Sequence, residues 1–438
     1  MTTRGKPLSY DNQRTVLKYM DVNSRTKVSL QCPSLRNLDS MLAIKIRNLQ
    51  LKRSSFQIDS NTYTVGIIKR YINTPTPDFV EIENWQGGFL HDVDQYGTKL
   101  NPSENEKDEN VVRSLQYALY RFKKGYNWGN WSQSEYEHIF RETEEDLLIY
   151  QLKKDGHPPP FSLYVQIMIT PEEGLPRFEY LNYDKPLKHA FDHLILKTLG
   201  KERQILVQSV QIGEEDDGSS HDVYIEFEDE NDGKFLRKTL PDPYFPIELN
   251  ARINVRTMTV YSVATNALNV IRPVLANPLE FLQVGNQIRR NNGLAHPVVK
   301  DCKYLEIMGS GILTILSKAP SRRVHLNRCQ YSEPEFKNLA ANWDEFQNKI
   351  GMFYSIGFEL QTDAVQLLNL FKSLSNAYWG ENEETKWTQH PKCAVVPLSD
   401  ISEWNIWFEQ TSEADMDYCK EPYIVKIKVA EKGYAKEY

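Results

Sequence analysis

Hydrophobic residues in the first 40 positions recur at the spacing of short helices. The pattern predicts three of them, over residues 10–20, 24–32 and 34–38. Ser24 is the predicted N-cap of the second helix, and Pro33 separates it from the third. About 30 helical residues are too few to bury all of these apolar side chains. We therefore expect the segment to pack against the rest of the chain or against a partner.

From residue 44 the hydrophobic period changes to two. Residues 44–71 are predicted to form strands, with a hairpin turn at Ser60-Asn61. Residues 73–110 are rich in proline, glycine and polar residues, which predicts a long surface loop. A helix over 111–122 follows. Residues 126–160 contain an acidic run and three consecutive prolines, and we interpret them as a boundary with solvated carboxylates.

A second helix, over residues 185–199, resembles the helix over 111–122. Its core-facing residues repeat those of the first helix 72 positions later, with Leu115, Ala118, Leu119 and Phe122 corresponding to Leu187, Ala190, Phe191 and Leu194. Strands are predicted around this helix, over 161–170, 205–212 and 223–227. Because any two core-facing helices share this pattern, a duplicated helix-plus-strand unit remains one of two alternatives.

The remaining chain alternates strands and helices at short intervals. Strands are predicted over 252–260, 304–307, 323–326, 354–360 and 423–429, and helices over 279–288, 312–318, 333–348 and 363–375. Units of this length are leucine-rich-repeat-like and favour parallel strands with helices behind them, although no strict L-x-x-L-x-L repeat recurs. The predicted fold class is therefore mixed α/β (α+β). Its predicted segments are a helical segment (1–40), a hairpin with one helix (41–155), a second helix-plus-strand unit (156–270) and the alternating region (271–430).

The amino-acid composition argues against several classes of protein, among them nucleic-acid-binding, membrane-spanning and secreted proteins. The chain has 438 residues, of which 40% are hydrophobic and 25% charged, as in ordinary globular proteins. Its net charge of −7 and the lack of a basic tract argue against nucleic-acid binding. No apolar run approaches the roughly 18 to 20 residues of a membrane span, and no secretory signal is visible. Five cysteines without a CxxC pair indicate reduced thiols, and hence the cytoplasm or nucleus.

Motifs for catalysis and cofactor binding are missing from the sequence. There is no phosphate-binding loop, no dinucleotide fingerprint and no nucleophile elbow, and Gly309-Ser310-Gly311 is interpreted as a tight turn. His189 and His193 have the i, i+4 spacing of zinc ligands, but Ala190 stands where a metalloprotease has its glutamate. Both histidines fall on the polar side of their helix, which favours a solvated pair. We expect no catalytic residue, no metal site and no cofactor.

Tryptophan is frequent in stretches that look like polar loops. These residues are Trp85, Trp128, Trp131, Trp379, Trp387, Trp404 and Trp407. Exposed tryptophans can anchor a protein partner, because interface hot spots favour Trp and Tyr. The alternative is that they cover the ends of the core.

The N-terminal segment resembles an F-box. The stretch Val16-Leu17-Lys18-Tyr19-Met20 is similar to the Ile-Leu-x-Tyr-Leu part of that pattern, and Val28-Ser29-Leu30-Gln31-Cys32 to its second helix. Ser9 replaces the usual proline and Asn12-Gln13 the usual apolar pair, so the box is degenerate. The resemblance implies docking on a Skp-type linker subunit. The residues that would make this contact are Leu8, Val16, Leu17, Tyr19, Met20, Val28 and Leu30.

The whole chain resembles a family of nematode F-box-C-related proteins that carry a domain of unknown function. The similarity rests on Pro7-Leu8-Ser9-Tyr10, on Arg25 followed by Cys32-Pro33-Ser34-Leu35-Arg36, and on 187–199 with the strand that follows. It also includes the stretch from Tyr304 through Ser332 to Asn342-Trp343, and then Ile350-Gly351. It implies an architecture more than an activity. At most it implies the substrate receptor of a Skp–cullin–F-box ubiquitin ligase.

The leading hypothesis is a non-enzymatic protein-interaction adaptor. Its N-terminal helices would bind the Skp-type linker, and the larger α/β body would bind an unknown substrate protein. Two alternatives remain: a protein-binding scaffold unrelated to ubiquitin, and an enzyme whose active site is dispersed along the chain. A buried, polar-lined pocket with convergent His, Asp or Glu side chains would favour the enzyme.

Overall fold

The fold is known from a computed structural model. It describes residues 8–52, 54–100, 108–124, 133–200, 203–213, 252–261, 264–285, 293–308, 318–327, 349–386, 392–413 and 419–437, and the single residues 288, 316, 332, 334, 337, 388 and 415. The chain forms two compact units. Unit 1 comprises residues 1–52 and 201–438, and unit 2 comprises residues 53–200. The segment limits expected from the sequence lie at other positions and stay a prediction.

Unit 1 begins with three helices, as the sequence predicts. They are α1 (Tyr10–Tyr19), α2 (Val22–Gln31) and α3 (Pro33–Ser40). The side chain of Ser9 accepts a hydrogen bond from the amide of Asn12 and caps α1. Asp21, and not Ser24, caps α2, because its carboxylate accepts the amide hydrogen of Ser24 at 2.9 Å.

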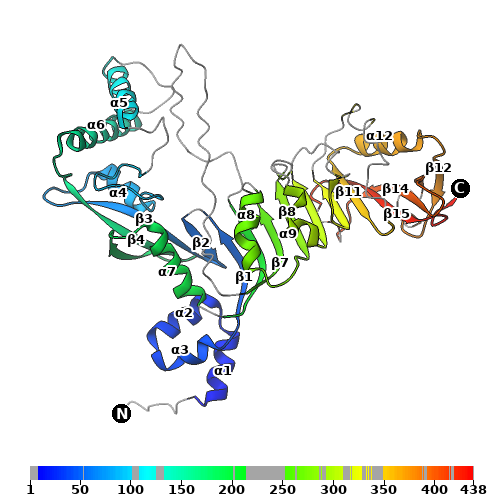
Figure 1. The fold of residues 1–438 in the computed structure, drawn as a ribbon, viewed down its shortest axis with the longest axis horizontal. Coiled ribbons are helices and arrows are strands. Elements are labelled where there is room, and N and C mark those ends of the chain that lie inside the picture. Colours follow the sequence, from blue (N-terminus) through cyan, green and yellow to red (C-terminus); the bar gives the residue numbers. More distant parts are fainter. Residues whose placement is uncertain are drawn as a thin grey trace. The chain divides into compact units, whose positions relative to one another are not determined.

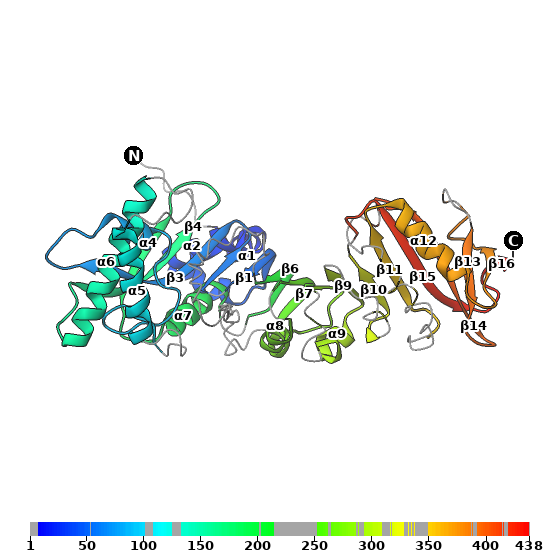
Figure 2. The same cartoon turned by 90° about the horizontal axis from the view of Figure 1, so that it is seen from above.

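Seven parallel strands follow one another in unit 1. In sheet order they are β1 (Ile44–Leu51), β6 (Ile205–Ile212), β7 (Ile253–Val260), β8 (Phe281–Gly285), β9 (Tyr304–Met308), β10 (Arg323–Leu326) and β11 (Phe353–Phe358). From β6 onward, each strand pairs with the next one in the chain. Parallel neighbours require crossover connections, and helices α8 (Ala264–Ile271) and α9 (Pro297–Asp301) lie in two of them. Figures 1 and 2 show both helices along one side of these strands.

The same spacing of buried residues recurs in the parallel strands. At six of them, positions i, i+3 and i+5 are buried, and in β8, β9 and β10 the first of the three lies just before the strand. The triplets are Ile46, Leu49 and Leu51; Val207, Val210 and Ile212; Val255, Met258 and Val260; Leu279, Leu282 and Val284; Cys302, Leu305 and Ile307; and Ser321, Val324 and Leu326. The residue between the last two buried positions points to the opposite face of the sheet. Each strand therefore presents one side chain at an equivalent place on that face.

The last part of unit 1 is antiparallel. Beyond β11 the order is β15 (Tyr423–Glu431), β14 (Ser402–Gln410), β13 (Cys393–Pro397), β12 (Tyr378–Glu381) and β16 (Lys436–Glu437). Helix α12 (Gln361–Lys372) packs on β13, β14 and β15. It buries Leu367 and Phe371 against them (Figure 1).

In its described residues, unit 2 contains an antiparallel sheet and four helices. The strand order is β2 (Ser55–Ile58), β3 (Asn61–Tyr71), β4 (Phe161–Thr170) and β5 (Arg177–Asn182). The helices are α4 (Asp78–Trp85), α5 (Asp108–Lys123), α6 (Gln133–Asp155) and α7 (Leu187–Leu199). Helices α5 and α6 pack on each other (Figure 1). Phe56, Tyr63 and Phe191 bring β2, β3 and α7 together in the core.

The mixed α/β fold class is confirmed, and so are most of the predicted strands. Strands β5, β12, β13 and β14 lie where no strand was predicted. Three of the predicted regions also differ. The predicted helix 279–288 contains strand β8, the predicted loop 73–110 contains helix α4, and the predicted boundary 126–160 contains the 23-residue helix α6. The helix α5 leads into α6 and not into a strand, unlike its counterpart α7. The expected strand 223–227 and most of the expected helices 312–318 and 333–348 lie outside the described residues.

Candidate functional site

A buried carboxylate anchors the N-terminal helices to the rest of unit 1. Asp39 in α3 accepts a hydrogen bond at 2.6 Å from Arg25 Nε in α2 and another at 2.7 Å from Nη2 of Arg203, just before β6. Arg25 Nη1 also donates to the carbonyl of Ala43 at 2.8 Å. Burial alone would raise the pKa of Asp39, but the two arginines outweigh it and hold the pKa below its usual value. The bundle is therefore docked on its own chain by an ionised group.

The predicted linker-contacting residues divide between the inside and the outside of this bundle. Leu8, Val16 and Tyr19 are 55%, 47% and 79% exposed. Leu17 is 1% exposed and belongs to the core. Met20 and Val28 are half-buried, and the side chain of Leu30 lies outside the described residues.

Two exposed apolar residues of α1 lie on one side of the helix and are not used by internal packing. We call Val16 and Tyr19, which are three residues apart on neighbouring turns, the α1 surface. Leu17 holds the helix from another side, and Tyr10, seven residues before Leu17, lies on that side and is 61% exposed. Large exposed apolar groups on neighbouring turns are typical of a surface that meets another molecule.

A row of polar side chains crosses the parallel sheet. The residues lie at paired positions on successive strands, and we call them the polar ladder: Gln50, Gln211, Thr259, Gln283, Glu306, His325 and Ser355. The first six each stand between the last two residues of a buried triplet, and Ser355 continues the row on β11. The ladder therefore marks the sheet face opposite those core residues.

Hydrogen bonds connect neighbours of the polar ladder. Thr259 Oγ1 donates to Gln283 Oε1 at 2.9 Å, and His325 Nδ1 lies 2.9 Å from Ser355 Oγ. Glu306 Oε1 accepts from Asn327 Nδ2 at 2.8 Å. The ladder is half-buried at its β6–β8 end and fully buried from β9 to β11. Burial raises the pKa of Glu306 to about 7, although hydrogen bonds from Gln283 and Asn327 oppose the rise.

An aromatic row runs beside the polar ladder on the same face. Phe281 and Tyr304 stack at 5.3 Å between ring centroids, and the guanidinium of Arg323 lies 6.0 Å from the ring of Phe353. These four residues occupy the ladder's strands two positions earlier, and Phe281, Tyr304 and Phe353 are half-buried. Aromatic and arginine side chains of this kind are enriched in protein interfaces.

A group of metal-ligand side chains lies at the buried end of the ladder. Ligand atoms of His325, Cys419 and Glu421 all lie within 4.8 Å of one another, and all three residues are buried. They come from β10 and from the connection between β14 and β15. No short motif contains all three residues, so this group could not be recognised from the amino-acid pattern.

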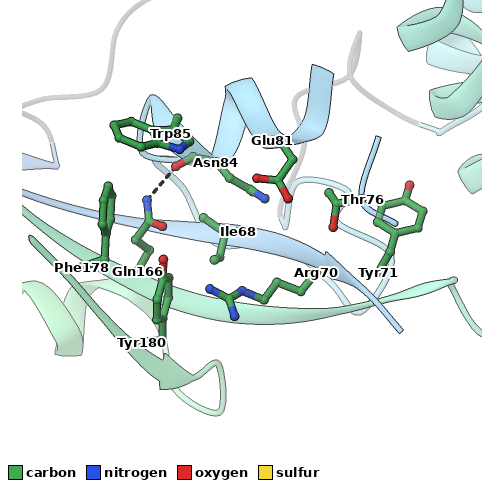
Figure 3. A pocket seen from close by; sticks show the side chains of 10 residues that line it. All are labelled: Ile68, Arg70, Tyr71, Thr76, Glu81, Asn84, Trp85, Gln166, Phe178 and Tyr180. Carbon is green, nitrogen blue, oxygen red and sulfur yellow. Dashed lines mark hydrogen bonds between the residues drawn. The ribbon is translucent and has the colours of Figure 1, made fainter. Parts of the chain in front are cut away.

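Unit 2 has a pocket of about 380 Å³ between α4 and the strands β3, β4 and β5 (Figure 3). Trp85 meets Phe178 edge to face at 5.3 Å, and the guanidinium of Arg70 lies 4.1 Å from the ring of Tyr180. Gln166 Nε2 donates to the Asn84 carbonyl at 2.7 Å and ties α4 to β4. Aromatic walls with one arginine form a small recognition surface.

Carboxyl groups gather around the buried Lys69 in the same unit. Burial raises the pKa of Asp146 to about 6; Lys69 opposes the rise, and Glu83 and Glu145 add to it. Burial also raises the pKa values of Glu83 and Glu142. The acidic run predicted as a solvated loop thus belongs to helix α6 and is partly desolvated.

This arrangement predicts a pH dependence of unit 2. A carboxyl pKa that is higher in the folded than in the unfolded state contributes stability below pH about 4, which is lost as the pH rises through about 6. We expect Asp146→Asn to remove part of this loss. Hydrogen exchange of the β3 and β4 amides, corrected for intrinsic rates, measures the local opening free energy at each pH. Equal pH dependence in the wild type and the variant would contradict the prediction.

Other sequence-based candidates have clear outcomes. His189 and His193 are both exposed, as expected for a solvated pair. Trp404 and Trp407 were predicted in loops, which is wrong: both lie in β14, at 0% and 2% exposure. Seven consecutive residues of β14 are buried, so the strand shows no alternation of apolar and polar positions. Trp128, Trp131, Trp387 and the Gly309-Ser310-Gly311 turn lie outside the described residues.

Membrane insertion finds no support among the helices of the described ranges. None of them combines the length and the apolar character that crossing a bilayer requires.

Comparison with known proteins gives one family match. A model of a "domain of unknown function (DUF3557)" matches residues 244–359, a range that contains strands β7 to β11. Neither the curated proteins nor the solved structures compared with the chain give a match. The chain is therefore similar, over strands β7 to β11, to a domain of unknown function.

Proposed function

We propose that this protein is a non-enzymatic interaction adaptor, the substrate receptor of a Skp–cullin–F-box ubiquitin ligase. The α1 surface would bind the Skp-type linker. The observation that carries this proposal is that different residues of the bundle are used for internal packing and exposed to solvent. Leu17 and the Arg25–Asp39–Arg203 cluster already fix the helices internally, so Val16 and Tyr19 are available to a partner.

The substrate would bind the face of the parallel sheet that carries the polar ladder. Sequential parallel strands with crossover helices and buried residues at i, i+3 and i+5 support a leucine-rich-repeat-like architecture for this part. Stacked repeats of this kind use one exposed face as an extended binding surface. The half-buried Phe281, Tyr304 and Gln283 supply aromatic anchors and hydrogen-bonding groups there.

Substitutions in the α1 surface test the linker contact. The double variant Val16→Asp/Tyr19→Asp is expected to weaken binding of a purified Skp-type linker by at least tenfold, because each apolar anchor contributes about 1–2 kcal/mol. Both side chains are exposed, so the fold tolerates the change. Binding is measured by titration calorimetry with the full-length protein.

The control is Arg14→Asp, an exposed residue on the opposite side of α1. It should bind like the wild type. Leu17→Asp is unsuitable, because it would place a charge in the bundle core. If the wild type does not bind the linker, or if the double variant binds equally well, the ubiquitin-ligase proposal is wrong.

The pocket of unit 2 favours a second candidate, a protein-binding scaffold unrelated to ubiquitin. Trp85 at its rim is 56% exposed beside Phe178 and Tyr180. A scaffold of this kind would keep its partners in the α1 double variant and would lose them with Trp85→Ala. Affinity purification of both variants, followed by mass spectrometry, separates the two candidates.

A further inference from the structure

We propose that His325, Cys419 and Glu421 bind one zinc ion in unit 1. Nitrogen, sulfur and carboxylate oxygen are the three ligand types that Zn²⁺ takes in proteins. All three side chains are buried, and their ligand atoms lie within 4.8 Å of one another. This site is independent of the proposed adaptor function.

The distances suit a tetrahedral ion. With metal–ligand bonds of about 2.0–2.3 Å, neighbouring ligand atoms of a tetrahedral site lie roughly 3.5 Å apart. Cys419 Sγ is 3.7 Å from Glu421 Oε2, which is close to such an edge. Bringing the imidazole to the same separation requires side-chain movements of about an ångström, since no pair of ligand atoms exceeds 4.8 Å.

Neighbouring residues orient the imidazole. Ser355 Oγ on β11 lies 2.9 Å from His325 Nδ1, so Nε2 is the nitrogen that would meet the ion.

Gly357 on β11 leaves room for the other two ligands. A Cβ atom at this position would lie 2.6 Å from Glu421 Oε2 and 3.2 Å from Cys419 Sγ. A side chain there would push both ligand atoms away from the strand. This is a second observation, separate from the ligand types, that the carboxylate and the thiol share one built space.

Zinc would fasten the connection between β14 and β15 to the end of the parallel sheet. That connection carries Cys419 and Glu421, whereas His325 lies on β10. Binding converts the Cys419 thiol into a thiolate and releases its proton to solvent. The three protein ligands leave a fourth position on a tetrahedral ion.

Metal titration of the full-length protein tests the site. The protein is stripped with a chelator and titrated with Zn²⁺, and with Co²⁺ as a spectroscopic probe. The wild type is expected to bind one ion per chain and to show the thiolate-to-cobalt charge-transfer band. Cys419→Ser should lose the band and at least 100-fold in affinity. The matched control is Cys393→Ser, another buried cysteine of unit 1, which should behave as the wild type.

Two further variants keep the test decisive if Cys419→Ser does not fold, as judged by circular dichroism. Glu421→Gln should lower the affinity at least tenfold, and Gly357→Ala should weaken binding by displacing the same carboxylate. A wild-type protein that binds no ion at one equivalent would overturn the proposal. So would an unchanged cobalt spectrum in Cys419→Ser or an unchanged affinity in Glu421→Gln.

Discussion

Asp39→Ala is expected to destabilise the N-terminal bundle by about 3–5 kcal/mol, because it leaves the buried guanidinium groups of Arg25 and Arg203 without their anion. The side chains of both arginines are less than a tenth exposed, so water cannot replace the carboxylate. Since a chain of two units need not unfold in one step, the local readout is hydrogen exchange of the α1–α3 amides. Those amides should exchange far faster in the variant.

The comparison variant is Asp11→Ala, which removes an exposed carboxylate from the first turn of α1. Its cost should stay below about 1 kcal/mol, the usual range of a helix-terminus charge. Asp39→Asn should fall between the two, since an amide oxygen can accept one of the arginine hydrogen bonds. If Asp39→Ala costs no more than Asp11→Ala, the cluster does not anchor the bundle.

Strands were predictable where apolar residues dominate a short run, and the common spacing of their buried residues was not. At β9 and β10 the buried triplets are Cys302, Leu305, Ile307 and Ser321, Val324, Leu326. A search for leucine misses such triplets, because these buried positions are also occupied by small or branched side chains other than leucine. The i, i+3, i+5 spacing became visible only when the paired strands showed which residues are equivalent.

The errors at β8 and α6 both arose from reading the local spacing of apolar residues. Leu279 and Leu282 are three positions apart, which is also the spacing of a helix face, so the entry into β8 resembled a helix. The opposite error was made at α6, where a helix was predicted as a boundary. Its acidic run obscured the helical spacing of the apolar residues. Tertiary packing decides both cases. Neither can be settled from a local pattern.

The candidate sites show the same limit. The α1 surface was visible in sequence because one helix carries it, although helical spacing alone did not reveal that Leu17 turns inward. His325, Cys419 and Glu421 could not be found, because strand pairing brings β10 to β11 and the β14–β15 connection then lies against Gly357. When strand pairing brings ligands together from distant parts of the chain, the sequence contains no motif with a characteristic spacing.

Trp404→Ala is expected to destabilise the antiparallel part of unit 1 by about 3–5 kcal/mol, the usual cost of removing a large buried aromatic residue. Trp404 is fully buried in β14 and meets Phe371 of α12 edge to face, at 5.8 Å between ring centroids. The cavity would lie between the helix and the sheet. Hydrogen exchange of the α12 and β14 amides should therefore rise together.

Trp85→Ala provides the contrast, because its neighbours in sequence are as polar as those of Trp404. Asn84 and Gln86 flank Trp85, whereas Glu403 and Asn405 flank Trp404. Trp85 is 56% exposed, so its loss should cost unit 2 no more than about 1 kcal/mol. Similar costs for the two variants would mean that Trp404 is not the packing centre between α12 and β14. Unequal costs would show that the surface against which each tryptophan packs, and not its neighbours in sequence, determines its contribution to stability.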